Sequence, residues 1–257
     1  MGDRVQDLQI FEDFNEEHEQ IIKYHVERTD YLGLPLRFRK HSPDVSEMLV
    51  RRSLTCRRLA ASYMIEACYF FRLAGVDKTL RWETLESLQL TSHMHGGRFI
   101  ESVENQREDE TNETLRLAGW AAARMPRLKK LDIWFAERQN AFCFSYRLSE
   151  TGVSIQWRGT WDLPLHEPVL HAWSHVALLA SDGRHTLTVL PSEIIDPDII
   201  NSNAKGIKIL GLGEDVLHPV SFQQMIHETD RYFFGFEPTQ ELLDERAEQR
   251  RVSALLV

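Results

Sequence analysis

An α/β fold built from repeated strand–helix units and one antiparallel hairpin is what this sequence predicts. Three observations support it. A short apolar pattern recurs four times along the first half of the chain. Two runs of alternating apolar and polar residues follow each other near the middle. Segments with apolar residues at helical spacing come after the strand-like segments, as in a fold that alternates the two.

The recurring pattern is LxxLxL, which begins at Leu85 and Leu128 and, in weaker forms, at Val5 and Cys56. In leucine-rich repeats this pattern marks a strand whose apolar residues face a stacked core. The starts are farther apart and less regular than the roughly 20–29 residues of a standard repeat. We therefore expect irregular leucine-rich-repeat-like units, with four buried residues on neighbouring strands: Leu88, Leu90, Leu131 and Ile133.

Residues 141–161 predict an antiparallel hairpin. Phe142, Phe144 and Tyr146 alternate with smaller or polar residues, and Val153 begins a second alternating run after a turn that contains Gly152. Two such runs joined by a short glycine-containing turn are typical of a hairpin with one buried face.

The remaining elements follow from apolar spacing and from proline positions. We expect a surface helix at 16–27, a helix at 115–125 ended by Pro126, a helix beginning at Pro168, strands at 186–190 and 206–212, and a helix opened by His218 and Pro219.

Acidic and basic residues are unevenly distributed along the chain. Residues 101–113 hold six acidic residues and one arginine with no large apolar residue after Val103, which predicts an acidic surface loop. Residues 37–58 are basic but lack interleaved aromatic residues, so a solvated helix face is favoured over a nucleic-acid surface. We expect a single domain over residues 1–236 and a charged helical tail over 237–257.

Composition excludes several classes of protein. The chain has 30 basic and 39 acidic residues, a net charge of −9 that opposes general binding to nucleic acid. No apolar run reaches the roughly 20 residues of a membrane span, and the first residues lack the pattern of a secretory signal. Three cysteines without a CxxC pair favour a reducing compartment, so we expect an intracellular protein, cytoplasmic or nuclear.

Histidines are the first candidates for a ligand or partner surface. His171 and His175 are four residues apart on the expected helix, so both side chains project from one face. His166 begins an HExxxH string that is one residue too long for the zinc-protease motif. A metal site would need a third ligand such as His93 or His95, and exposed or capping histidines are the favoured interpretation.

Arg158, on the polar side of the hairpin, completes the candidate surface. Trp157, Trp161 and Trp173 allow a ligand pocket near residues 157–175, although core packing is the favoured interpretation. Neither a nucleophile-elbow nor a P-loop motif occurs, and we expect no cofactor and no metal.

Several segments together resemble a large family of fungal proteins, many of which carry an N-terminal F-box followed by an irregular leucine-rich-repeat-like region. They are LESLQLTS at 85–92, MPRLKKLDIW at 125–134, SIQWRGTW at 154–161, AW at 172–173 and HPVS at 218–221. The resemblance implies an α/β repeat-like fold and a role in recognising substrates for a ubiquitin ligase.

The resemblance also sets the expected partners. No segment before Leu8 is long enough for an F-box, and LPLR at 34–37 is the nearest match to its opening. We therefore expect a non-catalytic module that binds a protein still to be identified, without a Skp-type adaptor and without a membrane. The alternative is a small-molecule enzyme or binder with its pocket near residues 157–175.

Deleting residues 238–257 is predicted to leave the melting temperature nearly unchanged. From Glu237 to Arg251 only Leu242 and Leu243 are large and apolar, too little to offset an ordering cost of roughly 1–2 kcal/mol per residue. Calorimetry of the full and shortened chains checks this, and a drop of more than a few degrees would show that the tail packs on the body.

Overall fold

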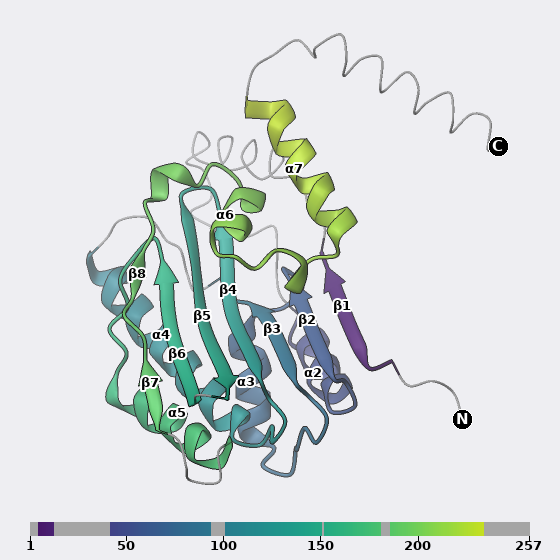
Figure 1. Cartoon of the computed structure of the whole chain (residues 1–257), viewed down its shortest axis with the longest axis vertical. Coiled ribbons are helices and arrows are strands. Elements are labelled where there is room, and N and C mark those ends of the chain that lie inside the picture. Colours follow the sequence, from purple (N-terminus) through teal and green to yellow (C-terminus); the bar gives the residue numbers. More distant parts are fainter. Residues whose placement is uncertain (1–4, 13–41, 94–100, 151, 181–185, 234–257) are drawn as a thin grey trace, which may run out of the picture.

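One mixed sheet with helices on both faces organises the protein (Figure 1). The computed structural model describes residues 5–12, 42–93, 101–150, 152–180 and 186–233. The strands are β1 (Asp7–Phe11), β2 (Arg58–Ser62), β3 (Ser87–Thr91), β4 (Lys130–Glu137), β5 (Asn140–Ser149), β6 (Gly152–Gly159), β7 (Leu187–Val189) and β8 (Glu193–Ile194).

Strand order follows chain order. Strands β1 to β4 are parallel neighbours, β5 runs antiparallel between β4 and β6, and β7 and β8 both pair with β6 in parallel. Helices α2 (Pro43–Ser53), α3 (Ala67–Val76) and α4 (Glu101–Ala122) lie between successive parallel strands in the chain. The predicted α/β class and the antiparallel hairpin are confirmed, and the rest of the sheet is mostly parallel.

The four LxxLxL segments form four adjacent strands in one register. Leu8, Leu59, Leu88 and Leu131 stand side by side across β1 to β4. Two residues later the row is Ile10, Ala61, Leu90 and Ile133. The expected burial of Leu88, Leu90, Leu131 and Ile133 on neighbouring strands is confirmed, since none of the four is exposed to solvent.

The hairpin extends these apolar rows. Tyr146 and Ile155 continue the row of Leu131, and Phe144 and Trp157 continue the row of Ile133. Alternating burial is found along β6 as predicted, but β5 is buried on both faces, with Cys143 and Ser145 also covered. The second face of β5 is covered because helix α6 packs against β4 and β5.

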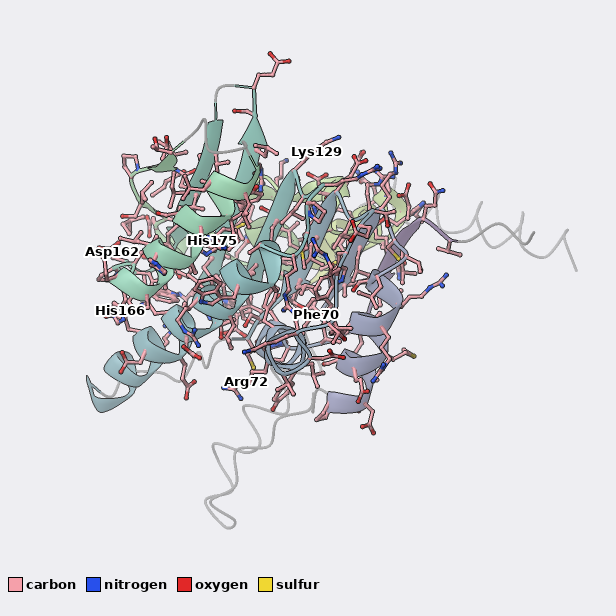
Figure 2. The ribbon with its side chains drawn as sticks, turned by 90° about the horizontal axis from the view of Figure 1, so that it is seen from below. Phe70, Arg72, Lys129, Asp162, His166 and His175 are labelled. Atoms are coloured by element: carbon pink, nitrogen blue, oxygen red, sulfur yellow. The ribbon has the colours of Figure 1, made fainter. Side chains whose placement is uncertain are left out.

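Helices α2, α3, α4 and α5 (Glu167–Ala180) cover the apolar face of the sheet (Figure 1). Figure 2 shows Phe70 of α3 on the sheet side of that helix and Arg72 on its outer side. Trp173 of α5 packs against Phe144 and Tyr146, with ring centroids 5.2 Å apart in both pairs. Its indole Nε1 donates to the carbonyl of Leu115, which joins α5 to α4.

The prediction of an acidic loop at 101–113 was wrong, because α4 begins at Glu101. Polar contacts replace the missing apolar residues. Asn112 is buried, donates to the Pro164 carbonyl and accepts from the His166 amide. Glutamate also has a high helix propensity, so an acidic segment anchored in this way forms a helix.

The prediction of a strand at 206–212 was also wrong, because α6 (Asn203–Ile209) occupies most of it. Ser202 caps this helix by accepting from the Lys205 amide. Gly206 lies against β4 so closely that an added Cβ would be 2.8 Å from the Cβ of Ala136. The apolar residues that indicated a strand, Ile207 and Leu210, are buried on one side of the helix instead.

The helix beginning near Pro168 and the strand near 186–190 are confirmed as α5 and β7. Pro219 opens α7 (Pro219–Phe233), as expected. The expected helix at 16–27 and the tail at 237–257 lie outside the described residues. Among the described residues, no helix is long and apolar enough to cross a bilayer.

Replacing Leu131 by alanine is predicted to lower the free energy of unfolding by about 2–5 kcal/mol, the usual cost of a large-to-small change in a packed core. Leu131 lies at the centre of the in-register row and has no exposed surface. Urea unfolding followed by circular dichroism measures the loss. Val76→Ala, at an exposed position on α3, is the matched control, and a similar loss in both variants would contradict the central role of the row.

Candidate functional site

The predicted histidines fall into three separate places. His171 and His175 are exposed on α5, where their rings flank Trp120 of α4 with centroids 5.9 and 5.5 Å away. Figure 2 labels His166 and His175 along this part of the molecule. His166, just before α5, places Nε2 2.7 Å from the Glu108 carboxylate. It therefore belongs to the contacts that hold α4 and α5 together.

His93 lies at the carboxyl end of β3, next to the side chain of Glu66, which is 13% exposed. The His93 backbone amide donates to Oε2 of Glu66 over 2.8 Å, and its ring Nδ1 is 3.4 Å from the same oxygen. Ser92 donates its hydroxyl to the other oxygen, Oε1. Burial acts to raise the pKa of Glu66, but these hydrogen bonds outweigh it and hold the pKa below its usual value.

Tyr63 completes this carboxyl-end cluster, defined as Tyr63, Glu66, Ser92 and His93. Its backbone has a φ of 61°, in the left-handed region that a bulky residue rarely adopts. The amide of Tyr63 donates to Thr91 Oγ1, and its hydroxyl donates to the Ala136 carbonyl. Carboxyl ends of parallel strands are where α/β proteins place ligands, so this cluster has the usual location of a site.

A metal centre gains no support within the described residues, where no three histidine, cysteine or carboxylate side chains come together as ligands. His95, the second candidate near β3, lies outside the described residues. His93 is on a strand end, whereas His171 and His175 are on the outer side of α5. The described part of the chain therefore does not bring His93 together with His171 and His175.

Arg158 lies on the second face of the sheet, in one row with Thr91, Trp134 and Cys143 of the neighbouring strands. Its guanidinium donates to the carbonyl of Leu210. Residues 210–217, called the strap below, cross this face between α6 and α7 (Figure 1). Three further side chains tie the strap to the sheet: Ser62 to the Val216 carbonyl, Gln9 to the Glu214 carbonyl and Lys130 to the Asp215 carboxylate.

Asp132 of β4 is the buried charge beneath this strap. Its Oδ1 accepts from Arg147 at 2.7 Å, and its Oδ2 is 3.7 Å from Lys130 Nζ. The thiol of Cys143 lies 3.8 Å from Oδ1, and burial raises the pKa of that thiol to about 12. A thiol with this pKa stays protonated near neutral pH, so Cys143 is not set up as a nucleophile.

The tryptophans mostly belong to the core, as the sequence favoured. Trp157 is stacked on Phe142 with centroids 5.1 Å apart, and Trp173 is fully buried. Trp161 is partly buried, with the Arg107 guanidinium 3.9 Å above its ring. These side chains fill the region 157–175 with packed aromatic rings.

An exposed aromatic and aliphatic surface remains on α4 and α5. Trp120 is 37% exposed, and Leu178 and Leu179, which follow His175 on α5, are 50% and 52% exposed. We call Trp120, His171, His175, Leu178 and Leu179 the helical patch. Contiguous apolar groups on a protein surface commonly mark contact sites for other macromolecules.

Sequence reasoning missed Trp120, Glu66 and Asp132. The position of Trp120 was accessible from the sequence, because it lies off the stripe of Leu115, Ala118 and Ala122 that faces the core. Asp132 alternates with Leu131 and Ile133, which places it on the opposite face of the strand. Glu66 carries no such signal, since its partners come from a different strand.

Comparison with known proteins gives one family. The profile of the family of unknown function DUF6546 matches residues 1–218, and the chain belongs to this family. Searches of curated proteins and of solved structures gave no match. The family description carries no activity, so association with an F-box stays a proposal.

Replacing His93 by alanine is predicted to destabilise the protein more at pH 7 than at about pH 3.5. Because the folded pKa of Glu66 is depressed, its stabilising effect is present above the unfolded value of about 4.3 and is lost as pH falls through the folded value. Removing the His93 ring leaves the Glu66 carboxylate with fewer hydrogen-bond donors. This loss costs about 1–3 kcal/mol while the carboxylate is ionised.

Urea unfolding at the two pH values measures the difference, with the exposed His171→Ala as the control. The ring contact of His93 with Phe135, at 4.7 Å, is lost at both pH values and so cancels. An equal loss of stability at pH 7 and pH 3.5 would show that Glu66 does not depend on His93 for its charge.

Proposed function

We propose that this chain is a non-catalytic protein-recognition module that binds its partner through the helical patch. The observation that carries the proposal is the exposed Trp120, whose ring contacts two histidine rings of α5, the second of them one turn before two exposed leucines on the same helix. Tryptophan is enriched among the residues that contribute most to protein interfaces, because it buries a large area at a small entropic cost. A single broad surface of this kind suits a partner protein.

The fold supports the same proposal. Parallel strands that follow one another in chain order, with intervening helices on one face, suit an irregular leucine-rich-repeat-like unit. Such units serve as recognition scaffolds, and the proposed use is the substrate-binding region of a ubiquitin ligase. The alternative, a pocket near 157–175, is less favoured because Trp157 and Trp173 are committed to core packing.

A photo-crosslinking amino acid at Leu178 tests the proposal in cells of the native source. We expect a discrete crosslinked product from position 178 and none from Val220, an exposed position on α7. Trp120→Ala should abolish the product while leaving stability nearly unchanged, since the side chain is partly exposed. The same products from both positions, or a product that survives Trp120→Ala, would contradict recognition by this patch.

A further inference from the structure

The sheet face beneath the strap is polar where it is most deeply buried. Asp132 and Trp134 are successive residues on this face of β4, and both have no exposed surface. Gln89 and Ser145 flank Asp132 on the neighbouring strands, and both are buried. We call Gln89, Asp132, Trp134, Cys143 and Ser145 the polar floor. A sheet face that is covered by other elements is normally apolar, so the burial of these residues requires an explanation.

Two buried polar atoms of this floor have no hydrogen-bond partner. They are Oδ2 of Asp132, an acceptor, and Nε1 of Trp134, a donor. The rest of the floor is satisfied in the closed form: Arg147 donates to the other oxygen of Asp132, and Cys143 and Ser145 contact each other over 3.3 Å. Unsatisfied buried polar groups are rare in folded proteins, so an acceptor and a donor left together on one face of β4 indicate that a further polar group belongs there.

The strap has the features of a hinged cover. Gly211 and Gly213 adopt positive φ values of 67° and 40°, and a Cβ at either position would meet open space. Four side chains from the sheet bind the strap, three of them through its backbone carbonyls. Leu212 and Leu217 are buried when the strap is closed. Leu210 and Val216 are buried as well, and all four side chains belong to the hydrophobic core, so opening breaks these apolar contacts together with the polar ties of one segment.

We propose that the polar floor under the strap is a binding site for a neutral, hydroxyl-bearing small molecule such as a monosaccharide or a cyclic polyol. A hydroxyl group donates to Asp132 Oδ2 and accepts from Trp134 Nε1, which satisfies both atoms at once. Lys130, Arg147 and Arg158 already surround Asp132 and Cys143 with positive charge, which disfavours an ammonium ligand. The buried carboxylate of Asp132, whose Oδ2 has no hydrogen-bond donor, disfavours an anion.

This site lies on the face opposite to the helical patch and goes beyond the recognition function. The ligand enters when the strap lifts, and the strap then closes over it, so the ligand-bound form is the closed one. Binding thus couples occupancy of the floor to the position of residues 210–217, which lead directly into α7.

Labelling of Cys143 with N-ethylmaleimide measures strap opening, because this thiol is fully buried on the same face. Peptide mass spectrometry separates Cys143 from Cys56, whose thiol is buried against the Arg52 carbonyl of α2 and reports global unfolding. We expect Asp215→Ala to speed labelling of Cys143 without changing that of Cys56, since it removes the tie to Lys130. The adjacent Glu214→Ala removes a charge of the same sign but keeps the Glu214 carbonyl that accepts from Gln9, and it should label like the natural protein.

Ligand binding is tested by the same readout with a panel of neutral monosaccharides and inositol. At ten times its dissociation constant, a ligand of the closed site slows Cys143 labelling about tenfold. General stabilisation by excluded sugars would slow Cys56 as well, and would persist in Trp134→Phe and Asp132→Asn. Specific binding should disappear in both variants, whose folding is checked by circular dichroism.

Three results would overturn the proposal. Cys143 labelling that keeps pace with Cys56 in every variant would show that the strap does not open by itself. Labelling of Cys143 that no member of the panel slows would leave a buried water as the partner of the two atoms. Protection that survives in both Trp134→Phe and Asp132→Asn would place the ligand elsewhere.

Discussion

The in-register stacking of apolar residues across the strands is the constraint on which the rest of the structure depends. Leu8, Leu59, Leu88 and Leu131 form one continuous row, because each LxxLxL segment presents its leucines at the same point of its strand. A slip of one residue in any strand would turn its leucines to the polar face. The helices α2 to α5 can cover a single apolar surface only while this register holds, and the hairpin extends the same rows.

The same register fixes what lies on the opposite face. Residues between the leucines point away from the helices, so Gln89 and Asp132 gather under residues 210–217. An apolar cover alone would leave these groups unsatisfied, and the strap is instead bound through hydrogen bonds from sheet side chains to its carbonyls. One face of the sheet is thus held by apolar packing, and the other by buried apolar residues such as Leu210 and Val216 together with polar ties to the strap.

Local patterns predicted the parts of this fold that depend on local spacing. The hairpin at β5 and β6 and the helix after His166 followed from alternation and from Pro168. Residues 101–113 were mistaken for a loop because their stabilising partners, Pro164 and His166, are more than fifty residues away. The pairing of Glu66 with His93 was hidden for the same reason, since side chains from separate strand ends meet only in the folded chain.

The two proposed surfaces are coupled weakly, and this follows from how each is anchored. The helical patch rests on α4 and α5, which Trp173 joins through the Leu115 carbonyl within the apolar layer. The strap contacts only the polar face, and the packed sheet separates the two. Changes at distant sites without shared partners usually add in free energy. Lifting the strap therefore leaves the patch in place, so a partner on α4 and α5 and a ligand beneath residues 210–217 can bind at the same time.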